Sequence, residues 1–319
     1  MAKQRHNPTR LRIGMLNPPA AKCSIYEAGI LMRDAIQDCP SIKFKYSEYP
    51  AMPEGGVDVW LAVYHHHSLP LGRHRFDSPV VAYILEMRPN DPFVMCREPF
   101  EAILCPDPTM QHPSPRVVPC GRPLPHPVVP YTHPSQSEIE HPVVGMFGFM
   151  TQGKQWDGLA RAILDEFDTA TLRLRLPIAT YVPAGQDYIE LIRRNITSLS
   201  SRLELEIEQQ YCSQAELVEW CRGNTLNAFL YDRDMPGLSA VPDQAVAAGR
   251  PIAVSTNETF RHVHPYVHPY GQQTLRGCIE QSQIGVPLMQ RDWADKEIQR
   301  ALLRAVKIAS PTLMLNTKI

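Results

Sequence analysis

The chain has 319 residues, 44% of them hydrophobic and 20% charged, and its formal net charge at pH 7 is −1. This length favours two domains of ordinary size over one, and the composition is that of a folded protein with sizeable cores. The near-neutral charge excludes strong nonspecific attraction to nucleic acid or to an anionic membrane surface.

The first third of the chain alternates short apolar runs with helical or polar segments. Strands are expected at 11–16, 42–46, 57–64, 80–85 and 102–104, and a helix over 23–38. The run at 57–64 is almost continuously apolar, which is typical of a parallel strand that is buried on both faces. This alternation predicts a parallel sheet with covered faces.

Prolines are dense from Pro106 to Pro142, in a chain that contains 31 of them. Such a run is incompatible with a helix, and only short edge strands such as 116–118 fit it. We therefore expect an extended connection over 106–142 and a boundary near residue 140. This gives an N-terminal domain over 1–140 and a C-terminal domain over 141–319.

The second half restarts with an apolar strand at 143–149 and repeats the same rhythm. Strands are expected at 172–178, 203–207, 228–231 and 252–254, and helices at 158–167, 187–200, 214–221, 243–248 and 293–309. The shared β/α rhythm predicts an α/β protein made of two Rossmann-like domains that face each other across a cleft.

The cysteines and apolar runs bear on the cellular compartment. Eight cysteines are scattered without a CxxC pair, at positions 23, 39, 96, 105, 120, 212, 221 and 278. Free thiols of a reducing compartment explain this spacing better than a disulfide framework. No apolar run approaches the ~20 residues of a membrane span, and the basic start lacks a signal-peptide core. The expectation is a cytoplasmic protein.

The first candidate site is the glycine loop from Gly148 to Lys154, which lies between a strand and a helix. Backbone N–H groups and an ammonium converge in such a loop and can hold a phosphate. The GxxxxGK[ST] pattern of a P-loop is absent. An ordinary connecting loop is the alternative interpretation.

The second candidate site follows the strand that ends at Tyr231. Small residues there let a ligand approach the backbone at the start of a helix, over Gly237, Leu238, Ser239, Ala240 and Val241. Asp243, one turn into the helix, can accept hydrogen bonds from a ribose diol. The alternative is a Pro-Gly turn before a carboxylate that only favours the helix dipole.

In this order the two motifs resemble the C-terminal half of the GT-B glycosyltransferases, and more closely their retaining glycogen-synthase-like family 4 (glycosyl transferases group 1). The resemblance covers residues 143–260. The place of the family's Gly-Arg and Lys-Gly loop is occupied here by VGMFGFMTQGKQWDGLARAI. The place of its Glu-flanked segment and the following helix is occupied by MPGLSAVPDQAVAAGRPIAVS. It implies a GT-B fold whose terminal helix returns toward the N-terminal domain.

The resemblance also implies an activity. A sugar would pass from a nucleotide-diphosphate sugar, a UDP- or GDP-sugar, to an acceptor with retention of configuration. The fold implies catalysis without a metal or other cofactor. The acceptor stays open among a glycan, a lipid, a protein, a small molecule and a modified base. Two rivals remain: an epimerase or phosphorylase of the same fold, and a scaffold protein with a decayed donor site.

The resemblance assigns the diphosphate to Lys154 and to the helix start at 239–241, with Gly148 and Tyr231 beside them. Fixed positive groups there would stabilise the charge that develops on the leaving phosphate.

The chain departs from the family pattern at two positions. Phe149 stands where the family has an arginine, and Met235 stands where the family has its first glutamate. Asp234 or Arg233 are the candidates to replace the lost carboxylate. Arg261, past the strand at 252–254, is the candidate to replace the lost cation; a surface loop cation is its alternative interpretation.

Polar residues after two N-terminal strands are candidates for the acceptor side and for catalysis. His65, His66 and His67 follow the strand at 57–64, and loops at strand carboxyl ends line the ligand site in such sheets. The resemblance gives His65 a contact with the sugar or acceptor. The alternatives are a solvated loop or one buried histidine, and a three-His zinc site is disfavoured because adjacent side chains diverge. On the loop 17–26 and just after it, Ser24, Tyr26 and Glu27 are further acceptor-side candidates.

Overall fold

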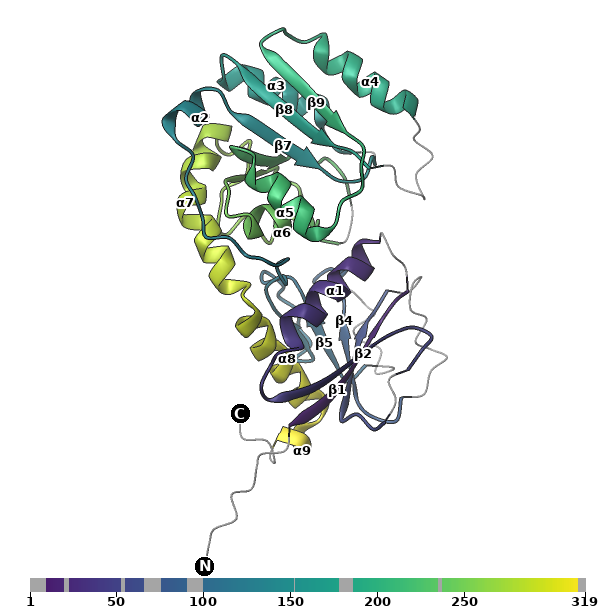
Figure 1. The fold of residues 1–319 in the computed structure, drawn as a ribbon. Coiled ribbons are helices and arrows are strands. Elements are labelled where there is room, and N and C mark those ends of the chain that lie inside the picture. Colours follow the sequence, from purple (N-terminus) through teal and green to yellow (C-terminus); the bar gives the residue numbers. More distant parts are fainter. Residues whose placement is uncertain are drawn as a thin grey trace, which may run out of the picture. The chain divides into compact units, whose positions relative to one another are not determined.

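The structure, a computed structural model, describes residues 10–19, 23–52, 55–65, 76–90, 100–151, 153–177, 186–234 and 237–314. The chain forms two compact units (Figure 1). The first unit consists of Met1–Pro123 and Trp293–Ile319, and the second of Leu124–Asp292.

This division differs from the boundary expected near residue 140. The segment after Leu124 packs on the second unit, where the Val129 N–H donates to the carbonyl of Ala247 at 2.7 Å and the Thr132 N–H to that of Gly249 at 2.8 Å. Because these hydrogen bonds satisfy its backbone there, the half of the proline-rich stretch after Leu124 is part of that unit and not a free connection. The half before it, with β6 (Val117–Pro119), belongs to the first unit.

The first unit contains a six-stranded sheet in the order β2-β1-β3-β4-β5-β6. All neighbouring strands are parallel. The strands are β1 (Leu11–Asn17), β2 (Ile42–Glu48), β3 (Val59–Val63), β4 (Val80–Tyr83), β5 (Ala102–Cys105) and β6 (Val117–Pro119). The strand order reverses between β1 and β3, as in other doubly wound sheets.

Two helices cover one face of this sheet, α1 (Ser24–Ile36) and α8 (Asp295–Ala309). Leu302 and Val306 of α8 belong to the same buried cluster as Ile13 and Leu61 of the strands. Figure 1 shows both helices against the strands of this unit. The short helix α9 (Pro311–Met314) follows α8. The C-terminal helix therefore completes the core of the first unit.

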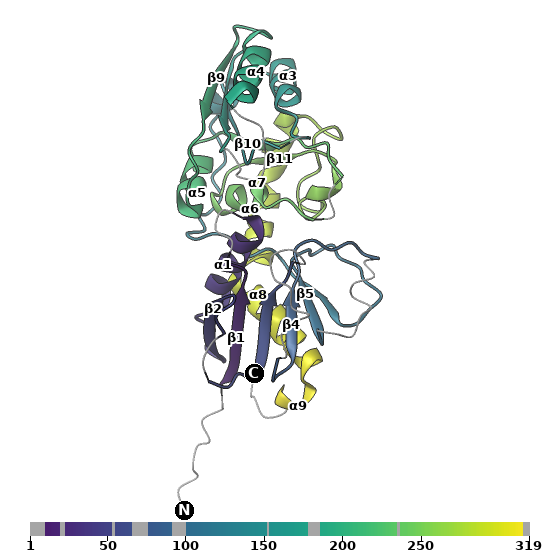
Figure 2. The same ribbon diagram turned by 90° about the vertical axis from the view of Figure 1, so that its right-hand side faces the viewer.

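The second unit contains a five-stranded parallel sheet in the order β11-β10-β7-β8-β9. The strands are β7 (Val143–Phe147), β8 (Ala170–Arg175), β9 (Leu203–Glu208), β10 (Leu226–Phe229) and β11 (Ile252–Val254). The helices are α2 (Gln136–Glu140), α3 (Trp156–Glu166), α4 (Gln186–Thr197), α5 (Gln214–Arg222), α6 (Val241–Ala247), the 3₁₀ helix η3 (Glu258–Phe260) and α7 (Leu275–Asp292). Figure 2 shows α3 and α4 on one side of this sheet and α5 on the other.

The helix α2 contradicts the expectation that no helix occurs between residues 106 and 142. Five residues between Pro134 and Pro142 are enough for one turn, and Ser135 caps it. The Ser135 hydroxyl accepts from the Glu138 N–H at 3.3 Å, while Glu138 Oε2 accepts from the Ser135 N–H at 2.8 Å. This capping box overrides the local proline density.

The N-terminus of α7 is capped by a side chain from another helix, Glu166 of α3. Its carboxylate accepts the N–H of Leu275 at 2.7 Å and that of Arg276 at 3.0 Å. We expect Glu166→Ala to lower the free energy of unfolding by about 1–2 kcal/mol, because two N–H groups lose their partner and the helix dipole its counter-charge. Urea unfolding checks this. The exposed neighbour Asp165, replaced by Ala, is the matched control, and equal losses in both variants would contradict the assignment.

Within the described ranges, no helix is both long and apolar enough to cross a membrane. In the same part of the chain, no group of three or more His, Cys, Asp and Glu side chains is arranged to hold a metal ion.

Candidate functional site

The strand order of the second unit reverses between β7 and β10. From β7 the chain proceeds through β8 and β9 on one side, and then through β10 and β11 on the other. In open parallel sheets ligands bind at the carboxyl ends of the strands at such a reversal. Gly148 directly follows β7, and Tyr231 follows β10. The topology therefore brings the two candidate motifs of the sequence to one place.

The segments after β7 and β10 are joined by backbone pairing. The Gln155 N–H donates to the Leu230 carbonyl at 2.9 Å, and the Asp232 N–H to the Gly153 carbonyl at 2.7 Å. These bonds flank an antiparallel bridge between Lys154 and Tyr231. The pairing fixes the position of Lys154 at the reversal point.

Lys154 is buried, with 9% of its surface exposed. Its ammonium donates to the Phe149 carbonyl at 2.6 Å and lies 5.3 Å from the ring centroid of Tyr231 and 5.7 Å from that of Trp156. Burial, and secondarily the nearby cation of Arg233, lower the pKa of Lys154 to about 7. No carboxylate of the described residues forms an ion pair with it.

Gly148 makes room for this ammonium. Its φ is +128°, and a Cβ at this position would lie 2.5 Å from Lys154 Nζ and 3.5 Å from Val241 Cγ1. The same glycine therefore contacts the lysine of the first motif and the start of α6 in the second. Only a glycine permits both the backbone conformation and this approach.

The small-residue segment before α6 is tied to the loop after β11. The Ser239 N–H donates to the Thr259 carbonyl at 2.9 Å, and the Thr259 hydroxyl to the Gly237 carbonyl at 3.0 Å. The Ser239 N–H is thus occupied in this structure and is not offered to a ligand. Leu238 and Ala240 are partly exposed, whereas Asp243 in the first turn of α6 is 1% exposed.

The polar candidates past β10 and β11 lie on loops at the same edge of the sheet. Asp234 is exposed, and Met235 lies outside the described residues. Arg261, just after η3, is partly exposed and donates through Nη1 to the Glu258 carbonyl at 3.1 Å.

In the first unit, His65 follows β3 and lies with Nε2 at 3.4 Å from Glu86 Oε2. His66 and His67 lie outside the described residues.

The structure adds a hydrogen-bond network around Tyr26 that sequence reasoning missed. Glu48 Oε1, at the end of β2, accepts from the hydroxyls of Tyr26 at 2.9 Å and Tyr46 at 3.1 Å, and Asn17 donates to the Tyr46 hydroxyl at 3.2 Å. Asn17, Tyr46 and Glu48 lie at the carboxyl ends of β1 and β2, and Tyr26 lies on α1. The available signal was therefore polar residues at the ends of two predicted strands. Ser24 is exposed and Glu27 partly exposed on the first turn of α1.

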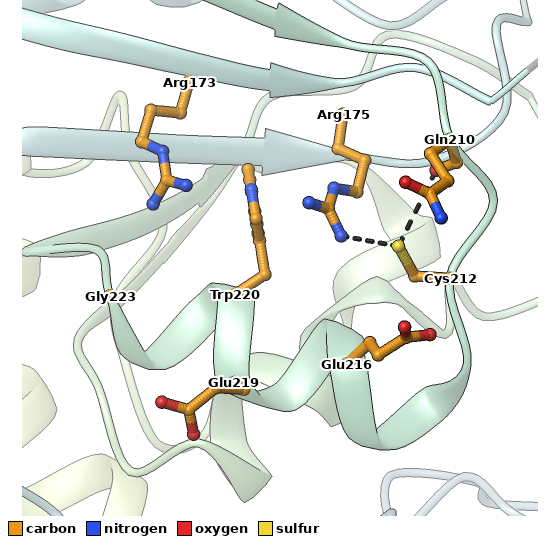
Figure 3. Close-up of a pocket in the computed structure, with 8 residues that line it drawn as sticks. All are labelled: Arg173, Arg175, Gln210, Cys212, Glu216, Glu219, Trp220 and Gly223. Atoms are coloured by element: carbon orange, nitrogen blue, oxygen red, sulfur yellow. Dashed lines mark hydrogen bonds between the residues drawn. The ribbon is translucent and has the colours of Figure 1, made fainter.

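A pocket of about 400 Å³ lies between α5, the strand β8 and the segment after β9 (Figure 3). It is lined by Arg173, Arg175, Gln210, Cys212, Glu216, Glu219, Trp220 and Gly223. The Gly148 N–H donates to the Arg175 carbonyl at 3.0 Å, so the glycine loop is bonded to the end of the strand that forms one wall. Figure 3 shows the Trp220 ring between the two arginines.

The arginines of this pocket have partners. Their guanidinium carbons lie 5.2 Å and 5.4 Å from the Trp220 ring centroid. Arg173 donates to Glu206 at 3.0 Å, and Arg175 forms an ion pair with Glu208. The alternation of LRLR in β8 opposite LELEIE in β9 produces these cross-strand pairs. Because glutamates balance both cations, this pocket is a structural charge ladder and a weaker candidate for anions than Lys154.

No family model matches the sequence, and no curated protein matches it either. Solved structures do match the fold. HepE of Anabaena in complex with UDP is 14% identical with a TM-score of 0.61, over 93% of this chain and 100% of HepE. The chain has the GT-B fold.

Further GT-B structures agree over nearly the whole length. A trehalose-6-phosphate protein of E. coli bound with UDP-2-fluoro glucose gives a TM-score of 0.59 at 11% identity, over 94% of this chain and 99% of that one. A glycosyltransferase of Rickettsia africae gives 0.58 at 6% identity, over 97% and 100%. The expected α/β class and GT-B fold are confirmed.

Proposed function

We propose that this GT-B chain is a glycosyltransferase that uses a nucleotide-diphosphate sugar and that its second unit binds the donor diphosphate at Lys154. The observation that carries the proposal is a buried lysine without a carboxylate partner among the described residues, at the point where the strand order reverses. An unpaired buried ammonium is costly, and an anionic ligand removes that cost.

The chemistry of glycosyl transfer fits such a group. As the bond between the sugar and the diphosphate breaks, negative charge grows on the leaving phosphate. A cation that is already fixed in a water-poor site stabilises this charge without reorganising. Burial lowers the pKa of Lys154 to about 7 in the ligand-free protein. A bound anion raises this pKa, because an opposite charge nearby favours the protonated ammonium.

The remaining assignments follow from the place of each residue. Gly148, Tyr231 and the segment from Gly237 to Val241 surround the donor diphosphate. Asp234 contacts the sugar hydroxyls, and Arg261 adds a cation at the rim. Asp243 is buried, so its contact with the ribose requires its carboxylate to become accessible.

The first unit supplies the acceptor side in this proposal. His65 acts on the sugar or acceptor, and the acceptor is bound by Ser24, Tyr26, Glu27, His66 and His67. The reaction proceeds with retention and without a metal, in the cytoplasm. UDP is the first donor nucleotide to test, since HepE was solved with UDP-glucose, and GDP is the second.

Thermal-shift binding with UDP, GDP, ADP and their sugars, followed by assays of donor hydrolysis, tests the proposal. We expect one nucleotide class to raise the melting temperature and its sugar to be consumed. Lys154→Gln should weaken binding by roughly 100-fold, the range seen when one fixed charge partner is removed.

The same assays separate the alternatives. No stabilisation by any nucleotide, or an unchanged Lys154→Gln variant, would contradict the proposal. Donor binding without turnover would indicate a decayed donor site. Turnover to an isomerised sugar or a sugar phosphate would indicate an epimerase or a phosphorylase.

Gly148→Ala tests the packing of the glycine against Lys154. We expect diphosphate binding to fall by more than about tenfold, because the new methyl group displaces the ammonium. Gly271 is the matched control, since it has a φ of +99° but nothing within 4 Å of a Cβ. Both variants should lose about 1–2 kcal/mol of stability through backbone strain. The affinity for UDP, measured by calorimetric titration, should then fall only for Gly148→Ala. An equal loss of affinity in both variants would contradict the role of Gly148 in positioning Lys154.

A further inference from the structure

Arg233 is a second cation beside Lys154. It lies in the loop after β10, two residues beyond Tyr231, and its guanidinium carbon is 4.8 Å from the centroid of the Tyr231 ring. Lys154 Nζ is 5.3 Å from the same centroid. The two positive groups therefore lie within roughly 10 Å of each other, the screening length of physiological salt.

The backbone of Arg233 is fixed from two sides. Asn257 donates through Nδ2 to the Arg233 carbonyl at 2.9 Å. On the other side, a Cβ at Gly153 would lie 2.9 Å from the Arg233 Cβ, so the glycine loop packs directly against this residue. The position of Arg233 relative to Lys154 is consequently a built feature of the second unit.

Among the described residues, no carboxylate forms an ion pair with Arg233 or with Lys154. Arg233 Nε is buried and has no hydrogen-bond partner among the same residues. A buried donor without a partner and two cations that repel each other both disfavour the ligand-free state.

Other arginines of the second unit show what a structural role looks like. Arg173 and Arg175 also stack on an aromatic ring, but glutamates on β9 pair with both of them. Arg250 is 7% exposed and pairs with Glu138 at 2.9 Å. Arginines that stack on a ring in this unit can therefore also have a carboxylate partner. Arg233 differs from them because it has none among the described residues.

We propose that Arg233 is the second phosphate-binding cation and that, together with Lys154, it binds the two phosphates of a nucleoside diphosphate. The inference rests on the proposed function, because it concerns the same donor site. It gives Arg233 the task of the family arginine that Phe149 replaces, a task the sequence suggested for Arg261. A guanidinium offers a planar pair of donors to phosphate oxygens, which an ammonium does not.

Calorimetric titration of the full chain with UDP, UMP and inorganic pyrophosphate tests this assignment. We expect Arg233→Gln to lower the affinity for UDP and for pyrophosphate by more than about tenfold. The affinity for UMP should fall much less, because a monophosphate can bind to the remaining cation, Lys154. Arg233→Lys should recover part of the loss. Arg193→Gln, at a partly exposed arginine of α4 that has no role in the proposed site, is the control and should bind UDP within about threefold of the wild type.

A second readout follows from the repulsion between the cations. Removal of Arg233 should raise the pKa of Lys154, so the alkaline limb of UDP binding should move to higher pH in Arg233→Gln. If Arg233→Gln does not fold, Arg233→Lys replaces it, because it keeps the charge but loses the planar pair of donors. Its affinity for UDP should then fall more than its affinity for UMP, and an unchanged ratio of the two affinities would overturn the assignment.

The outcomes distinguish this inference from the proposed function. If the wild type binds UDP, Lys154→Gln does not, and Arg233→Gln binds as well as the wild type, the role of Arg233 is wrong and the donor site stands. Equal losses for UDP and UMP also overturn it, since they point to the fold or the nucleoside. If the wild type binds neither UDP, GDP, ADP nor pyrophosphate, both proposals fail.

Discussion

Lys154→Met should be more stable than the wild type and should bind a nucleoside diphosphate roughly 100-fold more weakly. Methionine fills the space of the lysine stem in the cage of Trp156 and Tyr231 without a charge to desolvate. We expect a gain of roughly 2 kcal/mol at pH 7, within the range measured when buried ionic groups give way to apolar ones. The lost hydrogen bond to the Phe149 carbonyl reduces this gain but does not reverse it.

The pH dependence of this gain has a definite sign. The pKa of Lys154 falls from 10.5 in the unfolded chain to about 7 in the folded one. Between pH 7 and 10.5 the unfolded chain therefore binds more protons, and the wild type gains stability as pH rises through this window. The advantage of Lys154→Met should be largest at pH 7 and below and should vanish above 10.5.

Urea unfolding of both proteins between pH 6 and 9.5 measures this difference. A methionine variant that is less stable than the wild type at pH 6 would show that the folded protein does not pay a desolvation penalty at Lys154. Leu159→Met, which replaces one buried apolar side chain of α3 by another and removes no charge, controls for the introduction of methionine and should leave the pH profile unaltered.

Diphosphate affinity should fall by about tenfold per pH unit above pH 7, as Lys154 loses its proton in the free protein. Binding at pH 8.5 should therefore be accompanied by the uptake of nearly one proton. Titration calorimetry in two buffers of different ionisation enthalpy measures that uptake.

The matched variant for this prediction is Lys154→Arg, whose guanidinium stays charged over the whole range. Any diphosphate binding that it retains should be independent of pH between 7 and 9.5. An affinity of the wild type that is constant over this range would show that Lys154 does not contact the anion.

The sequence was sufficient for the α/β class and for the meeting of the two motifs. Continuous apolar runs such as 57–64 and 143–149 predict parallel strands, because a strand that is buried on both faces does not alternate between apolar and polar residues. The resemblance of the two motifs to the GT-B glycosyltransferases then implied that both bind one diphosphate.

Other features depended on contacts that a local pattern does not contain. The helix α7 carries Gly277, Gly285 and Pro287, which weaken a helical pattern, yet Gly285 is where the backbone of Tyr266 packs closely against the helix. The helix α2 is formed by a capping box in a proline-rich run. In both cases tertiary or capping contacts override local propensity.

The site shows the same limit. Lys154 was recognisable as a cation in a glycine loop. Its aromatic neighbours, however, are Trp156 and Tyr231, and Tyr231 comes from the segment after β10, far along the chain. The role proposed for Arg233 rests on the lack of an ion-pair partner among the described residues, which no sequence pattern reports. Conversely, Ser239 looked free to receive an anion, and its N–H is occupied by the Thr259 carbonyl.

The most direct test of the central claim is a crystal structure of the chain with UDP bound. We expect diphosphate oxygens within hydrogen-bond distance of Lys154 Nζ, at the carboxyl ends of β7 and β10. An ordered diphosphate elsewhere, for instance in the pocket between Arg173 and Arg175, with Lys154 still bonded only to the Phe149 carbonyl, would contradict the role proposed for Lys154.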